Sequence, residues 1–385
     1  MTALKYWLWL SLLQNVRNQM KLALLEHFGG PDAVFFAEEG EYALVEGMTR
    51  SVMQQLKNKS LTQADETLGR CERIGLRIIT LHDAEYPYRL KNIYDPPLLL
   101  YVQGRMPCFD DEVAIAMVGS RDASAYAMQM AEKIAFQLTS HGALVVSGLA
   151  ENGDASAHIG ALRAGGVTVG VIAGGHDVVY PPKNRHLYED LAVRGAILSE
   201  YPPGTKHMAR HFPVRNRILS GLCLATVVIE APERSGTLIT ANHALEQGRD
   251  VFAFPGQMED WHCIGSNRLL RDGAGVVTDV WDILNHYAEQ YPHRIHDRRR
   301  QEPKNFGGGR EVSAEPEKPA AQEPQMPVLD LRGDHGLTDD QIKIVRSLQG
   351  RTLQVDDLIE ETQIPTRRVL SALTVLEIEE IVTQE

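Results

Sequence analysis

The sequence predicts an α/β protein whose centre is a doubly wound parallel sheet, flanked by a small helical domain at the N-terminus and a winged-helix-like domain at the C-terminus. Between residues 113 and 254, short apolar runs rich in β-branched residues alternate with segments of helical spacing. Parallel strands that are covered on both faces read as such continuous apolar runs. A stretch rich in Pro and Glu, on both sides of residue 310, then separates this region from a last helical segment. The sequence therefore predicts several domains in order along the chain.

Residues 1–75 are predicted to form the N-terminal domain. Apolar residues recur at helical spacing, glycines punctuate the segment at Gly29-Gly30 and Gly47, and no run resembles a strand. The pattern predicts a small helical domain, loosely similar to a sterile-alpha-motif or helix-hairpin-helix unit.

The central domain is predicted over residues 76–288 as an extended Rossmann-like fold. The expected strands are the apolar runs 113–118, 143–146, 167–172, 225–229 and 251–254. The helices between them are expected to begin near Ala123, Asp154, Asn184 and Thr237. On such a sheet, ligands bind at the carboxyl ends of the strands, where helix N-termini expose backbone N–H groups.

The C-terminal part of the chain predicts a linker and a separate small domain. Residues 289–335 are rich in Pro, Glu, Lys, Gln and Gly and lack periodicity, which is typical of a flexible linker. Residues 336–385 contain three short helical patterns, the third opened by Pro365, and these fit a winged-helix module. Residues 337–385 carry ten acidic against five basic residues, so this domain is expected to be a poor DNA reader.

Composition limits the possible partners. The chain has 385 residues and a formal net charge of -12, so a nucleic-acid contact must come from a local basic patch. The four cysteines form no CxxC pair and no ligand-like cluster, which predicts a reducing, cytoplasmic compartment without structural zinc. No apolar run approaches the roughly 18 residues of a membrane span.

The most informative segment is basic. No acidic residue occurs from Pro203 to Arg217, while Lys206, Arg210, Arg215 and Arg217 are cationic. We interpret it as a basic loop in which Phe212 offers a stacking face for a base and the arginines reach phosphates, a combination used on single strands. A solvated basic surface loop is the alternative.

Small-residue turns follow four of the expected strands, and together they predict a composite anion site. Gly119-Ser120-Arg121 joins the close backbone approach that glycine permits to two side-chain donors. The other turns are Ser147-Gly148, Ala173-Gly174-Gly175 and Ser235-Gly236-Thr237. A single turn of this kind would be routine in an α/β protein, so the prediction depends on their number.

Motifs for catalysis are absent from the sequence. There is no G-x-G-x-x-G after the first strand, no G-x-x-x-x-G-K-[ST], no H-E-x-x-H and no G-x-S-x-G. We therefore predict no catalytic residue, no cofactor and no metal. Asp154 and Glu200 could form a paired-carboxylate site, but we favour helix capping and tethering of the arginines.

Eight blocks occur in a fixed order and closely resemble the DNA-processing protein A family, also called DprA or Smf. They are Gly119-Ser120-Arg121, Ser147 to Ala150, Tyr180 to Asn184, Ser199 to Pro202, Phe212 to Ile218, Ser235 to Ala241, Phe254 to Gly256 and Gly265 to Asn267. The resemblance implies a nonenzymatic, dimeric mediator that binds single-stranded DNA and brings the recombinase RecA to incoming DNA in natural transformation. Single-strand-binding protein is a further candidate partner, and no membrane is implied.

The resemblance implies a DNA-binding site at the positions of this chain that match the family's motifs. The expected DNA-binding residues are Gly119, Ser120, Arg121, Phe212, Arg215, Asn216, Arg217, Ser235, Gly236 and Thr237. The chain departs from the family at Glu151-Asn152-Gly153-Asp154, where Arg-Gly-Ile-Asp is usual, and Glu151 is expected to weaken affinity without abolishing it.

The sequence is also compatible with two other functions. Nucleoside-monophosphate phosphoribohydrolases have a similar sheet and a Gly-Thr turn, but this chain lacks both the leading Gly pair of their pattern and its closing carboxylate, where Thr240 stands instead. A protein-interaction scaffold whose basic loop binds an acidic partner is the weaker alternative.

Overall fold

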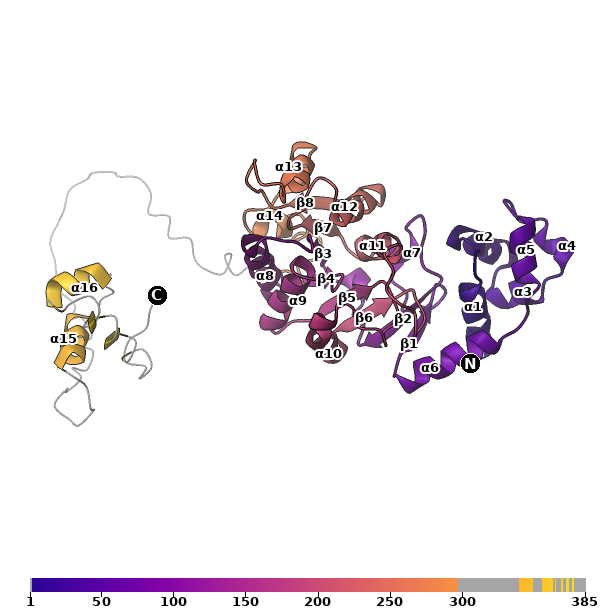
Figure 1. The fold of residues 1–385 in the computed structure, drawn as a ribbon, viewed down its shortest axis with the longest axis horizontal. Helices are drawn as coiled ribbons and strands as arrows, with labels where there is room; N and C mark the ends of the chain where they lie inside the picture. Colours follow the sequence, from indigo (N-terminus) through magenta and orange to yellow (C-terminus); the bar gives the residue numbers. More distant parts are fainter. Residues whose placement is uncertain are drawn as a thin grey trace, which may run out of the picture. The chain divides into compact units, whose positions relative to one another are not determined.

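The computed structural model describes residues 2–296, 339–348, 355–362, 364, 368–369, 372–373 and 376. Its N-terminal part consists of helices only (Figure 1). They are α1 (Thr2–Leu12), α2 (Asn18–Phe28), α3 (Pro31–Phe36), α4 (Glu39–Tyr42), α5 (Arg50–Leu56) and α6 (Thr62–Arg73). Figure 1 shows these helices in indigo and violet, beside the sheet.

A nine-stranded sheet in the order β1-β2-β6-β5-β4-β3-β7-β8-β9 forms the centre of the molecule. The strands are β1 (Arg77–Thr80), β2 (Leu99–Gly104), β3 (Ala114–Val118), β4 (Leu144–Ser147), β5 (Thr168–Ile172), β6 (Ala196–Ser199), β7 (Ala225–Val228), β8 (Asp250–Ala253) and β9 (Gly275–Val276). All pairs from β6 to β9 are parallel. This confirms the predicted parallel sheet.

Helices cover both faces of the sheet. They are α7 (Tyr88–Lys91), α8 (Ala125–Ser140), α9 (Gly153–Arg163), α10 (Arg185–Arg194), α11 (His211–Gly221), α12 (Gly236–Glu246), α13 (Ile264–Arg271) and α14 (Trp281–Leu284), with short 3-10 turns η1 (Phe109–Asp111) and η2 (Pro182–Asn184). Alternate residues of β3 face opposite layers: Ala116 joins the core that includes α11 and α12, while Ile115 and Met117 join the core that includes α8 and α9. A mostly parallel sheet with helices on both faces is doubly wound.

One edge of the sheet differs from the sequence prediction. β2 pairs antiparallel with both β1 and β6, so the sheet is mixed at this side. The apolar run from Leu98 to Val102 contributes to β2, and the strands expected from the sequence did not include β1, β2, β6 or β9. Periodicity alone does not distinguish a short apolar run in a strand from a buried helix segment.

The basic segment also differs from its prediction, because half of it is helical. Residues 211–221 form α11, so Phe212, Arg215 and Arg217 lie on a helix and not in a loop. Pro213 is the third helical residue, and a proline is tolerated in the first turn because the N–H it lacks has no intrahelical partner there. Helix α11 packs on the sheet through Ile218 and Leu219, which are 1% exposed.

The packed region extends beyond residue 288. Ile295 is buried in the core with α8 and α14, and the backbone N–H of His296 donates to the carbonyl of His141 at 2.9 Å. The first residues assigned to the linker therefore belong to the central core; residues 297–335 lie outside the described residues.

The described C-terminal residues form α15 (Asp339–Ser347) and α16 (Val355–Thr362). Ile344, Leu358, Ile364, Val369, Ala372 and Leu376 make up a separate small core. The predicted opening of a third helix at Pro365 lies outside the described residues. Within the described ranges, no helix combines the length and the apolar character that crossing a bilayer requires.

Candidate nucleic-acid interface

The four predicted turns meet at the carboxyl edge of the parallel strands, and the protein itself satisfies much of their hydrogen bonding. The N–H of Gly119 donates to Asp154 Oδ1 and that of Ala150 to Asp154 Oδ2, both at 3.3 Å. The N–H of Ser120 donates to the Glu230 carbonyl at 3.0 Å. The backbone N–H groups of Gly119, Ser120 and Ala150 are therefore engaged within the protein.

Close packing holds this first turn in place. A Cβ on Gly153, the first residue of α9, would lie 2.9 Å from the Cα of Gly119, so only glycine permits the two backbones to approach. Burial raises the pKa of Asp154, while Arg215 and the backbone N–H donors oppose the shift. The side chain of Ser120 accepts a hydrogen bond from the Asp122 N–H at 3.1 Å.

The N-terminus of α12 is more open. Ser235 caps the helix by accepting from the Thr237 N–H at 3.2 Å, and Thr237 itself is buried. Gly236 is exposed, and nothing lies within 4 Å of where its Cβ would stand. Asn216 on α11 donates to the Gly236 carbonyl at 3.4 Å. The structure therefore brings Asn216, Ser235 and Gly236 together beside a surface that an anion can reach.

Arg215 is 4% exposed and lies beneath this surface. Its Nη1 donates to the carbonyl of Gly148 at 2.9 Å and also to that of Val171, and its Nε donates to Asn216 Oδ1 at 3.2 Å. Burial lowers the pKa of the guanidinium, and Asp154 partly opposes this effect. Arg215 therefore ties α11 to the ends of β4 and β5.

Arg217 is held in an ion-pair cluster, which we define as Asp95, Glu200 and Arg217. Its guanidinium makes two bonds to the Glu200 carboxylate, at 2.7 and 2.9 Å, and Nε reaches Asp95 Oδ2 at 3.0 Å. Burial alone would lower the pKa of Arg217, but Glu200 and Asp95 raise it above its usual value. The interpretation of Glu200 as a tether for an arginine is confirmed, and the guanidinium of Arg217 faces carboxylates instead of solvent.

An aromatic cluster stands at the surface beside these groups; we define it as Arg121, Tyr180, His207 and Phe212. The Cζ of exposed Arg121 lies 4.6 Å from the centroid of the Phe212 ring and 5.9 Å from that of Tyr180. The two rings are 5.9 Å apart, and Tyr180 stacks on His207 at 5.4 Å. The sequence analysis placed Arg121 and Phe212 at the site but missed Tyr180 and His207.

The signal for the two missed residues was weak. Tyr180 appears in the sequence only as the first residue of the block Tyr180 to Asn184 that resembles the family. His207 stands three residues before Arg210 in the basic segment, with no motif of its own. At the same rim, Glu151 pairs with Lys183 at 2.7 Å, so the departure from the family sequence neutralises a nearby cation.

Acidic side chains also stand at this edge of the sheet, after β7 and β8. Glu230 caps α8 by accepting from the N–H and hydroxyl of Ser124 at 2.7 and 2.9 Å. In the part of the chain that the structure describes, one group of side chains has a spacing that could suit a metal: Glu230, Asp260 and Cys263, with ligand atoms within 4.8 Å of one another. The sequence spacing did not suggest this group.

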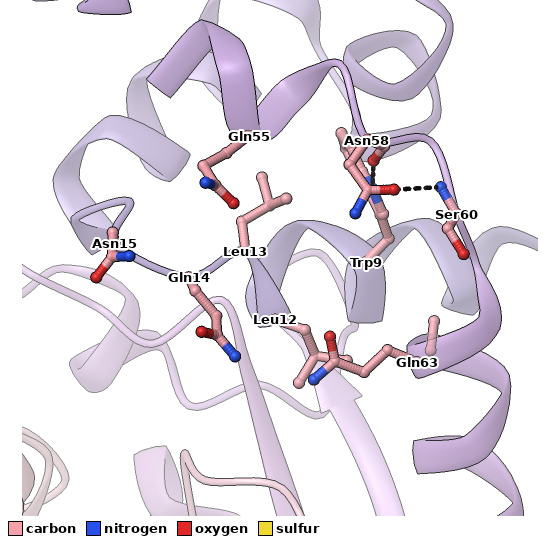
Figure 2. Close-up of a pocket in the computed structure, with 10 residues that line it drawn as sticks. Trp9, Leu12, Leu13, Gln14, Asn15, Gln55, Asn58, Ser60 and Gln63 are labelled. Carbon is pink, nitrogen blue, oxygen red and sulfur yellow. Dashed lines mark hydrogen bonds between the residues drawn. The ribbon is translucent and has the colours of Figure 1, made fainter. Parts of the chain in front are cut away.

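The N-terminal domain contains a cavity of about 260 Å³ (Figure 2). It is lined by Trp9, Leu12, Leu13, Gln14, Asn15, Gln55, Asn58, Ser60, Gln63 and Ala64. None of these lining residues carries a charge, so the cavity has no group that would attract a phosphate. Figure 2 shows Asn58 bonded to both Trp9 and Ser60 across one wall.

Comparison with known proteins identifies the fold. The family model for DNA recombination-mediator protein A matches residues 77–288, and the DprA winged helix domain matches residues 315–385. Protein Smf of Synechocystis is 31% identical over 99% of this chain and 96% of its own length.

Two solved structures are also similar. DprA from Streptococcus pneumoniae matches with a TM-score of 0.65 and 35% identity, covering 73% of this chain and 97% of its own. The DprA structure from Helicobacter pylori, described for its single-stranded DNA binding mode, matches with a TM-score of 0.51 and 27% identity, covering 56% and 97%. With a family model that spans more than half of the sequence, the chain belongs to the DNA recombination-mediator protein A family.

Proposed function

We propose that this chain binds single-stranded DNA at the carboxyl edge of its sheet and loads RecA onto incoming strands during natural transformation, without a catalytic step of its own. The aromatic cluster, in which exposed Arg121 lies over Phe212 and Tyr180, is the observation that supports the DNA-binding part of this proposal. Tyr180 is exposed and Phe212 is half-buried, and aromatic rings at a surface beside a cation suit unpaired bases and their phosphates, whereas a duplex hides its base faces.

The residues of the expected DNA site take different roles in this proposal. Arg121 and Phe212 contact the strand directly, and Asn216, Ser235 and Gly236 offer polar groups beside them. Gly119, Ser120, Arg215, Arg217 and Thr237 hold the surface in shape, since their donors are engaged within the protein or buried. Phosphate contact by Arg215 or Arg217 stays a prediction that salt-dependence measurements decide.

The test of the DNA half compares single-stranded and duplex oligonucleotides of equal length by fluorescence anisotropy. We expect the wild-type protein to prefer the single strand, and an Arg121→Ala/Phe212→Ala variant to lose that preference. The matched control is Arg194→Ala/Phe36→Ala, which removes an exposed arginine and phenylalanine elsewhere. Equal affinity of the wild-type protein for the two DNA forms would refute the proposal.

The recombinase half depends on family membership. The sequence has no P-loop, so we expect the protein to consume no nucleotide and to act by holding a strand and RecA together at high effective concentration. The measurement is RecA ATPase activity on single strands coated with single-strand-binding protein. No stimulation over buffer, or equal stimulation by the DNA-binding variant, would contradict the mediator role.

The proposal also covers the oligomeric state of the protein, its cellular compartment and a further partner. We expect a cytoplasmic homodimer, and light scattering on the purified chain measures its mass directly. Single-strand-binding protein is a candidate contact that pull-down without DNA would reveal. The phosphoribohydrolase alternative is not favoured, because Thr240 stands near the position of that pattern's closing carboxylate, and release of adenine from AMP is the measurement that would revive it.

A further inference from the structure

Tyr180 presents an aromatic ring at the surface of the aromatic cluster. The residue is 40% exposed, and its ring stacks on the half-buried ring of His207 with an interplanar angle of 24°. Phe212 meets the same ring at a tilt of 57°. One face of Tyr180 is therefore supported by protein, while a large share of the side chain remains accessible.

The backbone around Tyr180 is anchored. Its carbonyl accepts a hydrogen bond from the hydroxyl of Tyr188 on α10 at 3.0 Å. A few residues on, Asn184 donates to the carbonyls of Leu149 and Ala150 at 3.0 and 3.1 Å. These bonds join the segment to the turn after β4, so the ring is held by the sheet edge itself.

The ring behind Tyr180 is fixed as well. The Nε2 of His207 lies 2.8 Å from the Val178 carbonyl and donates to it. Burial lowers the pKa of His207, so the imidazole is neutral at pH 7 and supports Tyr180 as an aromatic ring. A supported ring loses little conformational freedom when a base stacks on it.

We propose that Tyr180 is a second base-stacking platform, so that Tyr180 and Phe212 hold two neighbouring bases of a single strand and Arg121 meets the phosphate between them. The inference rests on the proposed function and extends it to a dinucleotide unit. No base fits between the two rings, because they are in contact at 5.9 Å and steeply tilted. Each ring therefore takes its own base, and the Arg121 guanidinium lies over both rings.

The experiment compares Tyr180→Ala, Tyr180→Phe and a matched control, Tyr88→Ala, in binding a single-stranded oligonucleotide. Tyr88 is 68% exposed, and its N–H bonds Asp110 near the start of β3, at the opposite edge of the sheet. We expect Tyr180→Ala to weaken affinity roughly five- to 150-fold, which corresponds to about 1–3 kcal/mol for one stacked base. Tyr180→Phe and Tyr88→Ala should bind like the wild type.

A second oligonucleotide with abasic sites separates stacking from a change in structure. On this strand the loss caused by Tyr180→Ala should disappear, since no base remains to stack, and the salt dependence of binding should be unchanged on either strand. An equal loss on both strands, or wild-type affinity of Tyr180→Ala on the intact strand, would overturn the platform. If the wild-type protein fails to bind single strands at all, the proposed function fails instead.

Discussion

The aromatic cluster and the ion-pair cluster both use helix α11, yet they treat their arginines in opposite ways. In the aromatic cluster, exposed Arg121 lies over two rings and no carboxylate pairs with it among the described residues. In the ion-pair cluster, Arg217 is 6% exposed and bonded to Glu200 and Asp95. A cation is available to a ligand only where the fold brings no carboxylate to it.

The difference shows that the number of charged residues in a segment does not reveal which of its arginines are free to bind phosphate. The segment from Pro203 to Arg217 has no acidic residue, and this made both of its helical arginines candidates for phosphate. Glu200 precedes the segment by three residues, and Asp95 is more than a hundred residues away in the sequence. In the folded protein both carboxylates pair with the guanidinium of Arg217 and balance its positive charge.

The largest effect is expected from breaking the ion-pair cluster. Arg217→Met leaves Glu200 and Asp95 without their cation, and removal of one partner of a buried pair lowers the free energy of unfolding by about 3–5 kcal/mol. Urea denaturation measures this loss. The control is Arg268→Met, whose pair with Asp272 at 3.7 Å is exposed and should contribute below about 1 kcal/mol. Equal losses in the two variants would show that the cluster is no more than a surface pair.

The next effect concerns the aromatic cluster. Phe212→Ala should weaken single-strand binding by about 1–3 kcal/mol, because one stacked base loses its partner. Affinity for duplex DNA should change far less, so anisotropy titrations with both forms give the contrast. Phe36→Ala, which truncates a phenylalanine that is 71% exposed in the N-terminal domain, is the control. A proportional loss on both DNA forms would argue against stacking.

A smaller effect separates the two arginines directly. Arg121→Ala should reduce the log-log salt dependence of single-strand affinity by about 0.7, the value for one lost phosphate contact. Its stability should be unchanged, since the side chain is exposed. Arg194→Ala, at the C-terminal end of α10 and away from the cluster, should keep the wild-type slope. An unchanged slope for Arg121→Ala would remove this residue from the interface.

The smallest effect is expected from the C-terminal part. Deletion of residues 310–385 should leave single-strand affinity within a few-fold of the full chain, because residues 337–385 carry twice as many acidic as basic residues. Gel shifts at unchanged oligomeric state test this. A large loss would mean that the comparison of the two clusters omits a DNA-binding surface.

Much of the fold could be predicted from the sequence because its strands are buried on both faces. The runs that contain Ile115 and Val145 are apolar without interruption, and both residues are fully buried. The antiparallel strands β1 and β2 could not be predicted in the same way, since their order in the sheet depends on partners distant in sequence. Arg77 to Thr80 supplies only four residues of pattern.

The site was predictable only in part for a related reason. Phe212 and Arg121 stood out because each belongs to a short motif with its own chemistry. Tyr180 and His207 join them from two further segments, and no spacing in the sequence reports that the four side chains meet. The role of Asp154 also needed the structure. We expected this carboxylate to cap a helix, but α9 has no side-chain cap, and Asp154 accepts from the N–H groups of Gly119 and Ala150.

Asp154, in the first turn of α9 after β4, affects how free nucleotides compete for this surface inside a cell. Its side chain accepts the N–H groups of Gly119 and Ala150, so a free mononucleotide finds no deep phosphate hole at this position. We expect the other contacts proposed at this edge to be weak for a small molecule that meets them one at a time. A polymer touches several of them at once and gains from their sum through avidity. If the proposed function holds, we therefore expect free nucleotides to compete only weakly with a single strand for this surface.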